Sequence, residues 1–218
     1  MKKPFRIKEI KSNIFLFEFK NNYDMCMYFL RYQEYYESPS LKFRGKSFEI
    51  FDFMKWYSAT YGKGSFTYPD DWNGFNIPGN VIFDVYNLDL SDRNKYDSAM
   101  FEAWTQCHEK AGSHKFYIIG AVKNDNTALD HEIAHGFFYL YPEYKKETTK
   151  LVKSLDPKIR KSINSGLEKL GYTPKVYIDE TQAYLSTGLS EAFGHIDQWA
   201  AERKEFEKFY KKFLKETK

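Results

Sequence analysis

Residues 115–140, KFYIIGAVKNDNTALDHEIAHGFFYL, place a strand pattern directly before a helix pattern. Lys115 to Val122 is rich in β-branched and aromatic residues, which is typical of strands. Turn residues follow, and from Thr127 to Leu140 the apolar residues recur at helical spacing. Thr127 suits the N-cap, and Asp130 stands in the capping-box position. This stretch therefore predicts a strand that passes through a short turn into a helix.

Inside the predicted helix, residues 131–135 read His-Glu-Ile-Ala-His. Two histidines four residues apart on a helix are rotated by only about 40° from one another, so both imidazoles leave the same face. Each can place a nitrogen roughly 2.0–2.1 Å from one zinc ion. The intervening glutamate projects beside the metal, from where it can take a proton from a zinc-bound water. The motif predicts His131 and His135 as zinc ligands and Glu132 as a general base.

At this motif the chain resembles the zincin metallopeptidases. The metzincin branch continues its motif with a glycine and a third histidine, but Phe138 and Tyr141 stand at those positions here. All five methionines precede the motif, so the downstream methionine turn of that branch is excluded as well. The chain instead resembles the gluzincin branch, whose members take their third ligand from a glutamate on a later helix.

The acidic residues after the motif mostly lie among lysines, as on a solvated helix face. Only the segment 176–185, VYIDETQAYL, puts acids inside a largely apolar stretch. A carboxylate among such neighbours is costly unless it is paired or bound to metal. We therefore expect Glu180 to be the third ligand, on a helix that ends at Gly188. Asp179 is its rival, and would otherwise orient a histidine; Glu191 and His195 are weaker candidates.

Hydrolysis of a peptide bond also needs a hydrogen-bond donor for the negative charge that builds on the carbonyl oxygen. Tyr184, one turn beyond Glu180, is the first choice, and His195 and Tyr177 follow. With 18 tyrosines in the chain, Tyr184 is equally well interpreted as a packing residue. Asp130 has two interpretations as well, as a helix-capping residue or as a carboxylate that orients a ligand.

The resemblance implies an α+β, zincin-like fold in a single domain, 1–218. Its first half, 1–122, would contain a sheet and would end in an edge strand able to pair with an extended substrate. Its second half, 123–218, would be mainly helical. Further expected elements are strands at 13–19 and 81–85, and helices at 23–36, 51–61, 96–110, 144–155 and 157–170, with an apolar stripe on a C-terminal helix that packs into the core.

Composition narrows the classes of partner. The net charge is +3 and both signs are interspersed, so no nucleic acid is expected. The lysine-rich stretches 2–11 and 204–215 are interpreted as solvated faces. No apolar run approaches the roughly 20 residues of a membrane span, and no apolar signal segment is present, so we expect a cytoplasmic protein with no membrane partner. Two cysteines are too few for a disulfide framework.

Aromatic residues make up 19% of the chain and gather before the motif, notably in the loop around Tyr68–Phe75. They predict either the lip of a substrate cleft or a densely packed core.

The expected function is that of a zinc-dependent metallopeptidase, with one zinc ion per chain and a peptide or protein as substrate. Two alternatives remain. One is a regulatory protease with a single protein target, and the other is an inactive module that binds zinc for interaction. Glu132 argues against the second alternative, because a purely structural site does not need that base. The sequence leaves the oligomeric state open.

Overall fold

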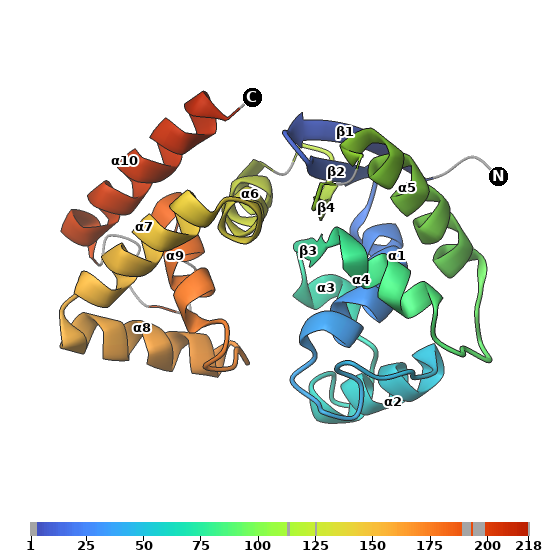
Figure 1. Ribbon diagram of the computed structural model, residues 1–218. Coiled ribbons are helices and arrows are strands. Elements are labelled where there is room, and N and C mark those ends of the chain that lie inside the picture. Colours follow the sequence, from blue (N-terminus) through green and yellow to red (C-terminus); the bar gives the residue numbers. More distant parts are fainter. Residues whose placement is uncertain (1–3, 113, 125, 189–192, 194–198, 218) are drawn as a thin grey trace. The chain divides into compact units, whose positions relative to one another are not determined.

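The computed structural model describes residues 4–112, 114–124, 126–188, 193 and 199–217 (Figure 1). The chain divides into two compact units, Met1–Asp125 and Asn126–Lys218. The division lies three residues after the expected one at 122/123. The first unit combines a sheet with helices, and the described part of the second unit is helical. The expected α+β class is confirmed.

Four strands of the first unit form one sheet in the order β1-β2-β4-β3. Strands β1 and β2 form an antiparallel hairpin, β2 and β4 run parallel, and β3 and β4 run antiparallel. Asn13 makes the hairpin turn with a φ of 61°, a left-handed conformation that asparagine tolerates better than most residues. The strands span Phe5–Lys11 (β1), Ile14–Phe19 (β2), Gly74–Pro78 (β3) and Tyr117–Val122 (β4).

Strand β4, which precedes the HExxH helix, lies inside the sheet. The expectation of an edge strand here is wrong, because β4 is hydrogen-bonded to β2 on one side and to β3 on the other. Its continuous apolar run is what a strand covered on both faces requires. Gly120 faces the ring of Phe29 so closely that a Cβ would come within 2.5 Å of it. An extended substrate therefore cannot add to β4.

One further expectation about the first unit is corrected. The segment 81–85 is not a strand but part of helix α4 (Gly79–Tyr86), and the strand β3 lies just before it in the predicted loop. A short apolar run cannot distinguish a strand from a buried helix. From Phe5 onward the stretch 2–11 forms β1, in which Phe5 is buried while Arg6, Lys8 and Glu9 are exposed, as expected of a solvated face.

The helices expected around 23–36, 51–61 and 96–110 are confirmed. They pack with the sheet around an aromatic core, and Arg31, itself 2% exposed, ties α1 to α5 through an ion pair with Asp97. Tyr68 and Phe75 are both buried in that core, so of the two interpretations of this loop the structure supports core packing. The helices span Asn22–Glu37 (α1), Ile50–Thr60 (α2), Tyr68–Asp71 (α3) and Lys95–Ala111 (α5).

A carboxyl group lies within this aromatic core. Glu34 is 5% exposed and accepts a hydrogen bond of 2.8 Å from the Tyr68 hydroxyl. Burial raises the pKa of Glu34 to about 7, although hydrogen bonds from Ser38 and Tyr68 oppose that rise. The unfolded chain releases this proton near pH 4.5, whereas the folded chain keeps it until about pH 7. The free energy of unfolding therefore falls as the pH rises through that window.

We predict that Glu34→Gln removes this pH dependence. Between pH 5 and pH 8 the free energy of unfolding of the wild type should fall by roughly 2 to 3 kcal/mol more than that of the variant. Urea unfolding followed by tryptophan fluorescence measures this, because three of the four tryptophans lie in the first unit. Glu109→Gln, at an exposed carboxyl group, is the control and should follow the wild type. Equal pH profiles for Glu34→Gln and the wild type would contradict the prediction.

In the second unit, helix α9 is packed against α6, α7, α8 and α10. Both helices expected between the motif and Glu180 are confirmed as α7 and α8, and Asp156 caps α8 just before Pro157. Helix α9 ends as expected before Gly188, whose φ is 143°. The helices span Asn126–Leu140 (α6), Pro142–Ser154 (α7), Pro157–Lys169 (α8), Tyr177–Thr187 (α9) and Ala200–Glu216 (α10).

Helix α10 turns its aromatic stripe inward. Phe206 and Tyr210 are buried, and the ring of Phe213 packs against Phe137 of α6 and Tyr144 of α7. The prediction that this stripe belongs to the core is confirmed. None of the described helices is both long enough and apolar enough to cross a membrane.

Candidate metal centre

The candidate site is built by two helices of the second unit that pack directly against each other. Helix α6 carries the HExxH motif, and α9 carries Glu180. Ala134 and Ala183 are both fully buried in these two helices, where small side chains allow a close approach. Four residues of separation place both histidines of α6 on one face, with their ring centroids 4.8 Å apart.

The three predicted ligand residues come together in the structure. The Nε2 atoms of His131 and His135 are 3.2 Å apart. The carboxylate of Glu180 reaches both histidines, with Oε2 at 3.6 Å from Nε2 of His131 and Oε1 at 3.6 Å from Nε2 of His135. Ligand atoms about 2.1 Å from one tetrahedrally coordinated ion lie roughly 3.4 Å from one another. The spacing of these atoms therefore fits a shared metal ion.

The surroundings of Glu180 also fit a cation. Its side chain is buried, and among the described residues Oε2 has no hydrogen-bond partner. An orphaned carboxylate oxygen is costly in the interior of a protein. Burial alone would raise the pKa of Glu180, but the charges of His135 and His131 outweigh it and lower that pKa. Glu180 is thus held as a carboxylate, the form in which it binds metal.

Asp179 lies on the other side of His135. Its Oδ1 is 2.9 Å from Nδ1 of that histidine, the nitrogen that faces away from Glu180. Of the two roles considered for Asp179, this geometry supports the orienting partner. Burial would lower the pKa of His135, but the negative charges of Asp179 and Glu180 hold it well above its usual range. The site therefore favours positive charge at its centre.

Glu132 and Tyr184 both lie beside the ligand cluster, which consists of His131, His135 and Glu180. The Glu132 side chain is buried, and the ring of Tyr184 lies 4.5 Å from that of His131. Burial raises the pKa of Tyr184, and the charges of Glu180 and Glu132 raise it further. The hydroxyl of Tyr184 consequently keeps its proton at neutral pH and can donate it in a hydrogen bond.

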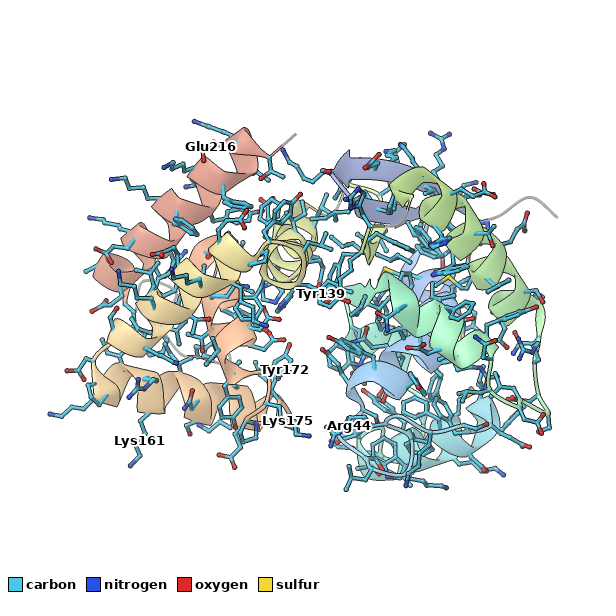
Figure 2. All side chains as sticks on the ribbon, viewed as in Figure 1. Arg44, Tyr139, Lys161, Tyr172, Lys175 and Glu216 are labelled. Atoms are coloured by element: carbon cyan, nitrogen blue, oxygen red, sulfur yellow. The ribbon has the colours of Figure 1, made fainter. Side chains whose placement is uncertain are left out.

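Sequence reasoning missed Tyr172, which lies in the segment between α8 and α9 (Figure 2). Its hydroxyl is 3.5 Å from that of Tyr184. Burial raises the pKa of Tyr172 well above its usual range, and the charge of Glu180 adds to that rise. The second missed residue is Gln182, fully buried on α9. No motif marks either residue, because their roles depend on contacts with other elements of the fold.

The remaining candidates have other surroundings. Asp130 accepts hydrogen bonds from the Tyr210 hydroxyl at both its main-chain oxygen and Oδ1. Tyr177 opens α9 and packs against the apolar core of this unit. Helix α6 begins at Asn126, one residue before the expected cap Thr127. Glu191 and His195 lie outside the described residues.

Comparisons with protein-family models, with curated proteins and with solved structures give no significant match. Within the described residues, His131, His135 and Glu180 form a group that could hold a metal ion.

Proposed function

We propose that this chain is a zinc-dependent metallopeptidase of the gluzincin type. The observation that carries the proposal is the convergence of His131, His135 and Glu180, whose ligand atoms lie within 4.8 Å of one another. Glu132, buried in the same helical turn, supplies the further carboxylate that hydrolysis needs. The zincin-like plan of the fold, with one catalytic domain, is part of this proposal.

The donor set favours zinc in a catalytic site. Two imidazoles and one carboxylate are a set found in zinc hydrolases, where the fourth position stays open. Structural zinc sites usually have four protein ligands, often cysteines. Both cysteines of this chain are buried in the first unit, and burial raises the pKa of Cys26 to about 12, which keeps that thiol protonated.

Bound there, a zinc ion would act as a Lewis acid that activates water and polarises the scissile carbonyl. Glu132 then accepts the proton of the attacking water and passes it to the leaving amine. Asp179 holds His135 in the orientation that directs Nε2 toward the ligand cluster. The hydroxyl of Tyr184, with that of Tyr172 beside it, donates to the carbonyl oxygen as its charge develops.

Cleavage of a peptide library tests this function. The zinc-loaded full chain is incubated with peptides from a digested proteome and, separately, with a native lysate, and new N-termini are identified by mass spectrometry. We expect new termini that disappear when zinc is removed with a chelator. New termini in the lysate alone would identify a protease with a restricted target. Without zinc-dependent termini in either mixture, the peptidase proposal fails.

We predict that Tyr184→Phe lowers kcat by roughly 10²-fold and leaves zinc affinity unchanged. The phenyl ring keeps the packing on His131, and only the hydroxyl is lost. Tyr172→Phe is the matched comparison and should have a smaller effect in the same direction. The measurement is turnover of a peptide found in the library, with zinc content determined in parallel. Full activity in Tyr184→Phe would leave this residue as a packing residue only.

A further inference from the structure

A chain of hydrogen bonds runs from the interior of the second unit to His135. The hydroxyl of Tyr144, on α7, donates to Oε1 of Gln182 over 3.0 Å. Nε2 of Gln182 donates to Oδ1 of Asp179 over 3.0 Å. The same Oδ1 is 2.9 Å from Nδ1 of His135. Residues from α7, α9 and α6 are thereby joined in one network.

The direction of this network is fixed by the chemistry of its members. Gln182 Nε2 faces two oxygens that only accept, the carboxylate of Asp179 and, at 3.3 Å, the main-chain oxygen of Ala134. The amide must therefore present its NH₂ group to them and its oxygen to Tyr144, which donates. Asp179 in turn accepts from Nδ1–H of His135, so that in the neutral imidazole, the form that binds metal, the lone pair is on Nε2, the nitrogen that faces Glu180.

Burial fixes the part of this network that Gln182 and Tyr144 form. Gln182 and Tyr144 are both 0% exposed, so no bulk water replaces their hydrogen bonds. The side chain of Asp179, in contrast, is 28% exposed. A partly exposed carboxylate turns toward water unless something holds it, and the buried amide of Gln182 holds it over His135.

We infer that Gln182 is a positioning residue for the metal centre, which it serves by holding Asp179, and through it His135, in the metal-binding orientation. Among the described residues, the hydrogen bonds of the Gln182 amide join it to Tyr144, Asp179 and the main chain of Ala134, not to a candidate ligand atom. This inference rests on the proposed metal site and assigns a role in it to a residue outside the HExxH and Glu180 pattern.

Zinc affinity of matched variants tests the inference. Gln182→Met keeps the length and burial of the side chain but removes its hydrogen bonds, and Tyr144→Phe removes only the distant donor. Leu185→Ala is the control, because Leu185 is fully buried on the same helix in an apolar cluster outside the network. Affinity is measured by competition with a chromophoric chelator, and stability by urea unfolding.

We expect zinc binding to weaken roughly 10-fold in Gln182→Met, the lower end of the effect known for residues that orient a metal ligand. Tyr144→Phe should weaken zinc binding less than Gln182→Met does. Leu185→Ala should lower the free energy of unfolding but leave zinc affinity unchanged. If Leu185→Ala weakens zinc binding as much as Gln182→Met, the effect is one of general stability and the inference is wrong. It is equally wrong if Gln182→Met binds zinc like the wild type.

A second readout needs no metal. In the metal-free protein, the proton on Nδ1 of His135 should give an NMR signal that exchanges slowly with water in the wild type and in Leu185→Ala. In Gln182→Met that exchange should be faster, because Asp179 is no longer held. Unchanged exchange overturns the inference. A wild type that binds no zinc defeats the proposed function, yet this exchange measurement still decides whether Gln182 holds the pair.

Discussion

Glu132→Gln should abolish peptide hydrolysis while the protein keeps its zinc. We expect kcat to fall by roughly 10²–10⁴-fold, which is the usual contribution of a general acid or base. The amide has the shape of the carboxylate but cannot take a proton from water. Zinc content should stay unchanged, because the ligand cluster consists of His131, His135 and Glu180. We would measure kcat by turnover of a library peptide, and zinc content by metal analysis of the same preparation.

The control for this variant is Glu143→Gln, which makes the same chemical change at an exposed position of α7. Its activity should equal that of the wild type. Retained hydrolysis in Glu132→Gln would remove this residue from the mechanism. Loss of zinc together with activity would make it a ligand instead of a base, contrary to the arrangement proposed here.

Glu180→Gln should weaken zinc binding by more than 100-fold, and Asp179→Asn by roughly 10–100-fold. Both changes keep the shape of the side chain and remove one negative charge. Glu180 faces the Nε2 atoms of both histidines, whereas Asp179 contacts the opposite nitrogen of His135. Loss of the ligand Glu180 should therefore weaken zinc binding more than loss of the carboxylate that orients His135.

The measurement is competition with a chelator at fixed pH and ionic strength, with both variants beside the wild type. If Asp179→Asn loses more affinity than Glu180→Gln, the roles of the two carboxylates are reversed. Equal and small losses in both variants would show that neither carboxylate contributes to a metal site.

The three candidate ligands were predictable because the two histidines are placed by local helix geometry and the glutamate is marked by its apolar neighbours. Helical spacing alone brings His131 and His135 onto one face. Glu180 was identified by the conflict between its charge and its apolar neighbours, and it is indeed buried beside both histidines. These inferences needed the periodicity of a helix, the cost of burying a carboxylate and the resemblance to the gluzincin branch, in which the third ligand is a glutamate.

What the sequence could not predict depends on pairing between distant segments. The run KFYIIGAV indicates a strand, but the sequence contains no signal that β3 pairs with one edge of this strand. The apolar segment 81–85 is short enough to suit either a strand or a helix. In the folded protein it forms part of helix α4. Tyr172 and Gln182 were missed for the same reason, since their partners lie on other segments of the chain.

The stoichiometry of zinc, measured by native mass spectrometry after chelation and reloading, tests the central claim most directly. We predict one zinc ion per chain in the wild type and none in His135→Ala, with the folded charge distribution retained in both. A wild-type chain that stays at its metal-free mass after reloading would contradict the metal centre and, with it, the proposed peptidase.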